Sequence, residues 1–343
     1  MTRNLYLGAD LGPILDAFKD TSNPFAVPLA ATATWNAVKA TNPEERMAAI
    51  AAEIAAERPA VVGLQEVTRW TTYASYNPAT GTGSGATVAY DFLDLLLDAL
   101  AAEGVVYEEV DGATASNFAS PAIPVIPPLA GGVAAVDLLD RDVILRRESV
   151  STWNAHNGTF EALGSFTAPT PTGPVTLPVK RGWGSVDVRT KLATFRFVNS
   201  HLEAFGDDLA EQLRYVQAGE LLAAQDAITQ TDGALPTVYV GDYNSRAPQG
   251  LAYNLLLSEV GADAWVEANP GDPGLTCCFD AAVTNEAALL RSRIDLILVD
   301  DEVVVHDAEV IGEDPASDMT PSALWPSDHA GVVATLEMDD SGE

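Results

Sequence analysis

Most residues that could do chemistry stand at the ends of apolar segments that are typical of β-strands. They are Asn4, Glu66, His201, Asp242, Asn244, Asp328 and His329. Open α/β folds gather their binding sites at strand ends, so we expect these side chains to meet at one edge. Asp295 differs, because it lies inside the apolar segment 293–299, where a buried carboxylate needs a partner.

These residue types fit the cleavage of a phosphate ester. That reaction needs a hard cation on the phosphate oxygens, a group that orients or deprotonates water, and donors that receive the developing charge. Magnesium is held by one or two carboxylates and keeps several waters. Glu66 and Asp328 could supply the carboxylates, with Asn4 helping through its carbonyl. Asp242 could align or activate water, and Asn244 could direct its amide at the phosphate.

The two histidines in this set could donate hydrogen bonds to phosphate. Asp295 could fix the tautomer of one of them, His201 or His329. Each feature also has an ordinary interpretation when taken singly. A Glu after a strand is usually a solvated strand end, Asp-Tyr-Asn is usually a turn, and Ser-Asp-His can be a cap. The other histidines, His156 and His306, have no motif around them and are interpreted as surface or structural residues.

The periodicity of apolar residues predicts the elements that position these side chains. Helices are expected at 44–58, 90–103, 207–228 and 249–258, and strands at 3–8, 60–67, 142–146, 183–188, 193–200, 237–241, 293–299 and 330–336. In the helix at 207–228, the spacing of Leu209, Leu213, Val216 and Leu221 predicts one buried face. The segments 74–88 and 111–135 are predicted to be loops.

Six blocks containing these residues occur in a fixed order along the chain. They are Arg-Asn-Leu (3–5), Leu-Gln-Glu-Val (64–67), Asn-Ser-His-Leu (199–202), Gly-Asp-Tyr-Asn (241–244), Arg-Ile-Asp-Leu-Ile-Leu (293–298) and Ser-Asp-His (327–329). The set resembles the endonuclease/exonuclease/phosphatase superfamily, which includes pancreatic-type deoxyribonucleases, abasic-site endonucleases, sphingomyelinases and inositol-polyphosphate 5-phosphatases. The resemblance runs from residue 3 to about residue 336. It implies an α/β fold, a four-layer sandwich of two mixed β-sheets flanked by helices.

The resemblance also implies roles for the site residues. Glu66 would be the principal ligand of Mg²⁺ or Mn²⁺, assisted by Asn4 and Asp328. Asp242 and Asn244 would handle water and phosphate.

Both histidines of the set also receive roles from the resemblance. His329, oriented by Asp295, would lie over the scissile phosphate as general base or transition-state stabiliser. His201 would act on phosphate or on the leaving oxygen.

Further blocks resemble a bacterial and archaeal branch whose members are often exported. They are Asn-Leu-Tyr-Leu-Gly-Ala-Asp (4–10), Asp-Arg-Asp-Val-Ile-Leu (140–145), Arg-Gly-Trp (181–183) and Leu-Thr-Cys-Cys (275–278). Asp10 and Arg181 would be additional contacts, Arg181 as a cation facing phosphate. Their alternatives are a turn carboxylate and a strand-edge arginine. Asp142 could support the site from behind.

The predicted function is metal-dependent hydrolysis of phosphate esters, with phosphodiesters, either nucleic acid or a small diester, as the first choice. The alternative is a phospholipid head group or a phosphomonoester, favoured by the acidic surface and the apolar, Pro-rich loop 118–133. That loop could equally be a lid packed on the domain. A catalytically silent binding scaffold is the third hypothesis. The loops at 74–88 and 111–135 contain no Lys or Arg, which argues against broad binding of duplex nucleic acid.

Composition adds a strong acidic bias. The net charge is −31, and lysine supplies only four of the 18 cationic residues. Such a chain resembles proteins of salt-loving organisms, where screening makes self-repulsion tolerable; an acidic protein of a GC-rich mesophile is the alternative. Cys277 and Cys278 are adjacent and are interpreted as small buried residues, with a vicinal disulfide as the alternative.

We expect one domain over residues 1–343 with a short acidic tail at 338–343, acting as a monomer. No apolar run approaches the roughly 20 residues of a transmembrane helix. The first strand is predicted within three residues of Met1, so no signal peptide is visible. An extracellular location, with an export signal missing from this sequence, is expected over a cytoplasmic one.

Overall fold

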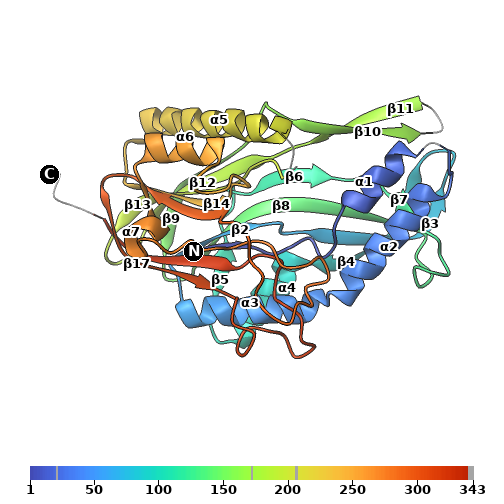
Figure 1. Cartoon of the computed structure of the whole chain (residues 1–343), viewed down its shortest axis with the longest axis horizontal. Coiled ribbons are helices and arrows are strands. Elements are labelled where there is room, and N and C mark those ends of the chain that lie inside the picture. The colour runs from blue at the N-terminus through green and yellow to red at the C-terminus, as the bar shows by residue number, and fades with distance from the viewer. Residues whose placement is uncertain (21, 171–172, 205–207, 339–343) are drawn as a thin grey trace.

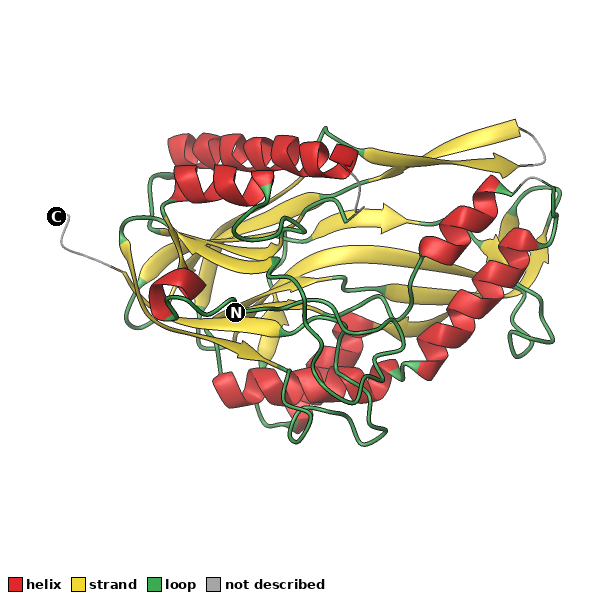
Figure 2. Ribbon diagram, viewed as in Figure 1, coloured by secondary structure: helices red, strands yellow, loops and turns green. Residues whose placement is uncertain are grey.

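The computed structural model describes residues 1–20, 22–170, 173–204 and 208–338. Two large mixed β-sheets face each other, and helices lie on their outer faces (Figures 1 and 2). This arrangement confirms the predicted four-layer α/β sandwich. Within the described residues, no helix is long and apolar enough to cross a membrane. Of the expected tail, only Met338 is described.

The first sheet has the central strand order β17-β18-β1-β2-β8-β3-β4, and β5, β6 and β7 also pair with β8. Its strands are β1 (Thr2–Asn4), β2 (Val61–Gln65), β3 (Arg69–Asn77), β4 (Thr82–Asp91), β5 (Tyr107–Glu109), β6 (Ala115–Ala119), β7 (Ile123–Pro124), β8 (Ala135–Arg147), β17 (Val303–Ile311) and β18 (Gly331–Met338). The pair β1 and β2 is parallel, so their carboxyl ends meet at one edge.

The second sheet has the order β15-β16-β14-β13-β12-β9. Its strands are β9 (Ser151–Thr159), β12 (Gly182–Arg189), β13 (Thr194–His201), β14 (Thr237–Asp242), β15 (Ala262–Asp263) and β16 (Asp295–Val299). Here β13 and β14 are the parallel pair. A separate hairpin of β10 (Gly164–Thr170) and β11 (Gly173–Val179) extends from one end of the molecule (Figure 1).

Seven helices are described. They are α1 (Gly12–Lys19), α2 (Ala26–Ala40), α3 (Pro43–Glu57), α4 (Phe92–Ala102), α5 (Asp208–Asp232), α6 (Leu251–Val260) and α7 (Ala264–Ala268). Helices α3 and α4 begin at side-chain caps, because Asn42 accepts from the backbone N–H of Glu45 and Asp91 from that of Leu93. The bounds of α3, α4 and α6 confirm the helices predicted at 44–58, 90–103 and 249–258.

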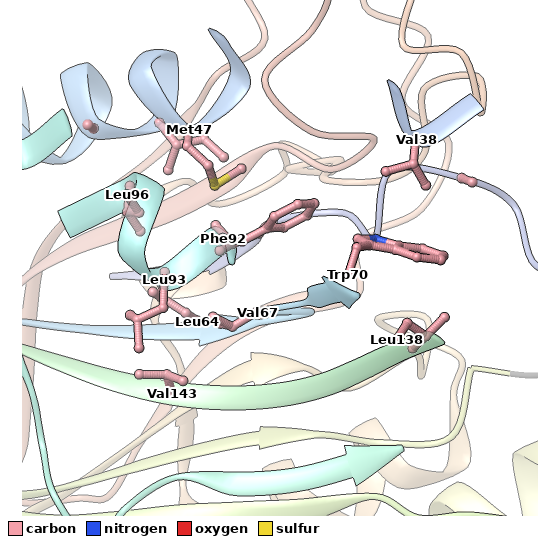
Figure 3. Close-up of a cluster of buried hydrophobic side chains, with 14 of the residues drawn as sticks. Val38, Met47, Leu64, Val67, Trp70, Phe92, Leu93, Leu96, Leu138 and Val143 are labelled. Atoms are coloured by element: carbon pink, nitrogen blue, oxygen red, sulfur yellow. The ribbon is translucent and has the colours of Figure 1, made fainter. Parts of the chain in front are cut away.

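Apolar side chains fill each of the three spaces between the layers. In Figure 3, Leu93 of α4 lies over Leu64 and Val143 of the first sheet, and the ring of Phe92 extends toward the side of Trp70. Between the sheets, buried residues of β2 and β8 pack with those of β12, β13, β14 and β16. Helices α5 and α6 cover the outer face of the second sheet. The sheets approach each other closely at Gly63, where an added Cβ would lie 2.5 Å from a methyl group of Val240.

Two segments predicted as loops contain strands. Segment 74–88 belongs to the antiparallel hairpin β3–β4, and segment 111–135 contains β6 and β7. The abundance of Gly, Pro and Ser favoured loops. The long strand β8 nevertheless offers backbone partners to all three of β3, β6 and β7, and these distant pairings outweigh local composition.

The predicted buried face of α5 is wrong in part. Leu209 and Val216 are 71% and 49% exposed. The buried positions include Ala210, Arg214, Gln217, Ala218, Leu221 and Gln225. Three of these are polar and have specific partners, since Gln217 accepts from the N–H of Glu203 and Gln225 from the hydroxyl of Ser185. Polar residues with partners can occupy a core face, which an apolar periodicity does not detect.

Helices α1 and α2, which cover residues 12–40 almost completely, were not predicted. Helix α1 has only eight residues, and α2 is rich in Ala with a weak apolar pattern. Both nevertheless contribute buried residues to the outer core, among them Ile14, Trp35 and Val38.

Candidate active site

Strand pairing brings three of the predicted site residues into one row. His201 of β13 lies opposite Asp242 of β14, and Asp242 lies opposite Asp295 of β16. In the first sheet, β1 ends at Asn4 beside the last residue of β2, which Glu66 follows. The ends of both parallel strand pairs therefore supply the site.

Asp242 is the centre of the site. Its Oδ2 accepts a hydrogen bond from the side-chain amide of Asn4 at 3.1 Å, and its Oδ1 accepts one from the backbone N–H of Asn244 at 2.9 Å. The Nε2 atoms of His201 and His329 lie 3.7 Å and 3.8 Å from the same Oδ2. Residues from both sheets thus converge on one carboxylate oxygen.

His329 and Asp295 form a buried pair. The distance between Nδ1 and Oδ2 is 2.9 Å, and the backbone N–H of Asp295 donates to the hydroxyl of Thr276. Burial lowers the pKa of His329, but the carboxylates of Asp295, Asp242 and Asp328 outweigh burial and raise this pKa well above its usual range. The carboxylates therefore favour a protonated ring.

Asp328 places a second carboxylate near His329, with its Oδ1 3.9 Å from Nε2. In the described part of the chain, this buried Oδ1 has no hydrogen-bond partner. Burial raises the pKa of Asp328 to about 7; Glu66 and Asp242 add to the rise, while His329 and Arg46 oppose it. An unpaired carboxylate oxygen close to other carboxylates suits a hard cation.

Glu66 is held in an uncommon backbone conformation. Its φ of 56° lies in the left-handed region, which Tyr6 and Asn244 also adopt, at 59° and 50°. This region costs a residue with a side chain about 1–2 kcal/mol, and such costs concentrate at functional sites. The Oε2 of Glu66 accepts from the backbone N–H of Leu7 at 2.7 Å, which fixes the carboxylate against the segment after β1.

The two asparagines keep hydrogen-bonding capacity for a ligand. The side-chain oxygen of Asn4 accepts from the backbone N–H of Tyr6 at 2.8 Å, and the amide nitrogen of Asn244 donates to the carbonyl of Leu202 at 3.2 Å. An amide oxygen has two lone pairs and an amide nitrogen two hydrogens. Each of these atoms can therefore make one more contact.

His201 and Arg181 are turned toward each other. The Nδ1 of His201 lies 3.3 Å from Nη1 of Arg181 and 3.7 Å from Oδ1 of Asp142. The same Nη1 is 3.6 Å from Oδ2 of Asp140. Burial, followed by the charge of Arg181, lowers the pKa of His201 to about 4.

Behind this pair lies a buried polar cluster of Asn117, Asp140 and Asp142. Burial raises the pKa of Asp142 to about 7, and burial together with Asp142 raises the pKa of Asp140 well above its usual range. Of these three residues, only Asp142 was predicted to support the site. Asn117 lies on β6, inside a segment predicted as a loop, so no sequence signal placed it beside the site.

Two buried arginines tie the site's segments together. Arg3 donates from Nη1 to the carbonyl of His329 and from Nε to Glu53 of α3 at 2.9 Å. Arg46 donates to the carbonyls of Leu5, Tyr6, Thr41 and Pro326. The segment after β1 and the segment before β18 are thus fixed to α3. Arg3 belongs to the block Arg-Asn-Leu (3–5) of the sequence analysis, whereas Arg46 lies in none of the family blocks.

Asp10 lies at the margin of the site. It is exposed, and its Oδ1 accepts from the backbone N–H of Gly12 at 2.7 Å at the start of α1, which is the contact of a turn carboxylate.

Cys277 and Cys278 form a disulfide, the alternative interpretation of this pair. Cys277 is buried, and its backbone pairs with Ser292 and His329. The disulfide therefore adjoins His329, two residues before the last strand.

Comparison with known proteins gives a consistent result. A sequence model of the Endonuclease/Exonuclease/phosphatase family matches residues 33–329. No curated protein sequence matches the chain.

Similar solved structures include an endonuclease/exonuclease/phosphatase family protein from Leptotrichia buccalis, with 16% identity, a TM-score of 0.53 and coverage of 87% of this chain and 94% of that one. The catalytic domain of human Nocturnin with bound sulfate has 21% identity and a TM-score of 0.51, with 86% and 87% covered. A mannosyl-6-phosphatase of Bacteroides thetaiotaomicron has 17% identity and a TM-score of 0.54, with 88% and 94% covered.

At these identities the structures establish the shared fold, and the family model extends over most of the chain. The chain therefore belongs to the Endonuclease/Exonuclease/phosphatase family, whose members are hydrolases of phosphate esters.

Proposed function

We propose that this protein hydrolyses phosphodiesters with the help of a divalent cation. The observation that carries the proposal is the approach of two imidazole Nε2 atoms to one oxygen of Asp242, with His329 backed by Asp295 at 2.9 Å. Phosphoryl transfer to water requires a group that orients the water and groups that exchange or donate protons. The carboxylate of Asp242 and the two imidazoles supply these.

The residues of the site fit Mg²⁺ or Mn²⁺. Glu66, Asp328 and Asn4 supply hard oxygen ligands, and Asp328 has a buried, unpaired Oδ1 among the described residues. The carboxylates of Glu66 and Asp242 both act on Asp328, and a group of carboxylate oxygens is the kind of ligand that a hard divalent cation binds. When bound, the cation would neutralise charge on the phosphate oxygens and polarise the phosphorus centre.

The side chains would divide the remaining work. Asp242 would orient the attacking water, fixed for this by Asn4 and Asn244. His329 would hold or move a proton at Nε2, because Asp295 occupies its Nδ1. His201 would act on the phosphate from the other imidazole.

The second candidate is a phosphodiesterase of phospholipid head groups. It is favoured by exposed apolar residues on and beside α2: Phe25 at 63%, Leu29 at 45% and Leu129 at 59% exposure. The side chain of Asn36 donates to the carbonyl of Leu129, which attaches this residue to α2. Scattered apolar residues are common on surfaces, so the candidate stays second.

A substrate panel tests the proposal. Purified protein would be assayed with magnesium and with EDTA on a chromogenic phosphodiester, plasmid DNA, RNA, a phosphomonoester and sphingomyelin. Magnesium-dependent turnover of the diester or the nucleic acids supports the proposal, and turnover of sphingomyelin alone would select the second candidate. Activity on the monoester alone, or activity indifferent to EDTA, would contradict it.

We further propose that the protein acts as a monomer, adapted to salt and outside a reducing cytoplasm. The net charge of −31 supports adaptation to salt, and the disulfide of Cys277 and Cys278 supports an oxidising compartment. Thiol alkylation without reductant tests the latter, since two alkylated cysteines in protein isolated from its native host would contradict it. Light scattering in molar salt tests the monomer.

A further inference from the structure

Two imidazoles that face the same carboxylate oxygen have partners of opposite charge. Behind His329 lies the carboxylate of Asp295, 2.9 Å from Nδ1, whereas behind His201 lies the guanidinium of Arg181, 3.3 Å from Nδ1. Environments that separate two titratable groups in this way usually give them different tasks.

Strand pairing builds the contact between Arg181 and His201. Arg181 directly precedes β12, and the first residue of that strand, Gly182, is the Cα partner of His201 at the end of β13. The space at Gly182 is filled, because an added Cβ would lie 2.3 Å from the carbonyl oxygen of Gly158. The backbone therefore presents the arginine beside the imidazole.

The chemistry of the two groups fixes the direction of the hydrogen bond. A guanidinium has five N–H donors, has no acceptor and stays charged in proteins. The Nδ1 of His201 must therefore accept, so it carries no proton, and the single proton of the neutral ring lies on Nε2. A doubly protonated ring would direct an N–H at the cation. His201 is fully buried, so water cannot screen that repulsion.

The positions of the neighbouring carboxylates, Asp140 and Asp142, are consistent with a hydrogen bond donated by Arg181 to His201. Asp140 lies 3.6 Å from Nη1 of Arg181 and holds the guanidinium in place. Asp142 is the rival partner that could accept a proton from Nδ1. Its Oδ1 is 3.7 Å away, beyond hydrogen-bond distance, whereas the arginine is within it.

The other ring nitrogen of His201, Nε2, faces the carboxylate of Asp242 in the candidate active site. The Nε2 of His201 is buried, lies 3.7 Å from Oδ2 of Asp242 and has no hydrogen-bond partner among the described residues. We propose that Arg181 is a positioning residue that fixes His201 as a neutral imidazole with its proton on Nε2. His201 is then a hydrogen-bond donor to phosphate or water. This inference rests on the proposed function only for the identity of the acceptor.

Nitrogen NMR of protein labelled with ¹⁵N-histidine tests the inference without substrate or activity. Four histidines give resolvable ring signals, and the loss of one set in His201→Gln assigns His201. In the wild-type protein at neutral pH, we expect a neutral ring protonated on Nε2. In Arg181→Met, Nδ1 should gain a proton or the tautomers should mix, while Arg181→Lys, which keeps a cationic donor, should restore the wild-type signals.

Arg146→Met is the matched control, because Arg146 pairs with Glu108 at the surface, away from the site. It should leave the His201 signals unchanged. With the diester that the substrate panel identifies, Arg181→Met should lower kcat by roughly 10–100-fold, since a donor loses its orientation, with a smaller change in KM and partial rescue in Arg181→Lys.

The outcomes separate the two proposals. A wild-type His201 protonated on Nδ1 or on both nitrogens overturns the inference, and so does an unchanged tautomer in Arg181→Met. If that variant does not fold, the wild-type and Arg181→Lys spectra still decide. A protein with the expected spectra but no hydrolase activity would refute the proposed function and leave the positioning role of Arg181 standing.

Discussion

The Nδ1 of His329 lies 2.9 Å from Oδ2 of Asp295, and this contact joins the two sheets of the sandwich. Asp295 opens β16 in the second sheet, whereas His329 stands just before β18 in the first. The backbone of His329 is held separately, by Arg3 and by pairing with Cys277. The geometry of the site therefore depends on the packing of the two sheets against each other and on the strand pairing within each sheet.

Asp295→Asn should abolish most activity while preserving the fold. The amide has nearly the shape of the carboxylate, but it can donate to Nδ1 and so place the His329 proton on the wrong nitrogen. In a comparable His–Asp pair, this change costs about 10⁴-fold in kcat, and we expect a loss of 10³–10⁴-fold. Steady-state assays with circular dichroism check this. Asp226→Asn, an exposed change on α5, is the control; a loss under tenfold in Asp295→Asn would refute the pairing role.

Glu66→Gln should weaken the response to the cation. Gln keeps an oxygen ligand but removes the charge. The apparent activation constant for magnesium should therefore rise at least 10-fold, the range seen when metal sites are altered. Magnesium titrations of activity, after EDTA treatment and dialysis, measure it. Glu302→Gln, in the exposed turn after β16, is the matched control. Superimposable titrations for wild type and Glu66→Gln would remove Glu66 from the metal site.

The parts of the site that lie at strand ends were predictable from sequence. When Asp or Glu follows a buried strand, its carboxylate lies at the edge of the sheet where the parallel strands end. Asp242 and Glu66 are such residues, and the family blocks fixed their order. Asp295 was recognisable because a carboxylate inside an apolar strand requires a partner, and His329 is that partner in the structure.

The contacts among the supporting residues were not predictable, for a physical reason. Arg181 was expected to face phosphate, but its approach to Asp140 and the position of Asn117 arise only because β6, β8 and β12 come together, and no local pattern encodes that arrangement. The polar inner face of α5 escaped for a similar reason, since Gln217 is buried by its partner and not by its hydrophobicity. Apolar periodicity reports transfer from water, whereas these residues are placed by hydrogen bonds formed at long range.

Asp187→Ala should be strongly destabilising without touching the site. The side chains of Asp187 and Arg196 are each 1% exposed, and Nε of Arg196 lies 2.8 Å from Oδ1 of Asp187. Arg196 also donates to the hydroxyl of Thr229 in α5 and to the carbonyl of Gly233, which follows that helix. Removing one partner leaves a buried cation uncompensated, which costs roughly 3–5 kcal/mol of unfolding free energy. Urea unfolding measures it. Asp16→Ala is the control, because the Asp16–Lys19 pair is 75% and 74% exposed and should contribute little. A cost in Asp187→Ala no larger than in the control would contradict the importance of the buried pair.

The net charge of −31 predicts that salt stabilises the folded protein. Compact folding brings acidic side chains together, and their repulsion falls as the screening length shortens from about 10 Å at 0.1 M salt to about 3 Å at 1 M. The melting temperature should therefore climb by several degrees from low to molar salt. Sodium and potassium chloride should act alike, and sulfate is avoided because it strengthens apolar burial by itself. A variant with exposed Glu57, Glu103, Asp226 and Glu302 changed to Lys reduces the repulsion, so its melting temperature should depend less on salt. A flat or falling response in the wild-type protein would exclude adaptation to salt, and an equal slope in the variant would assign the effect to something other than net charge.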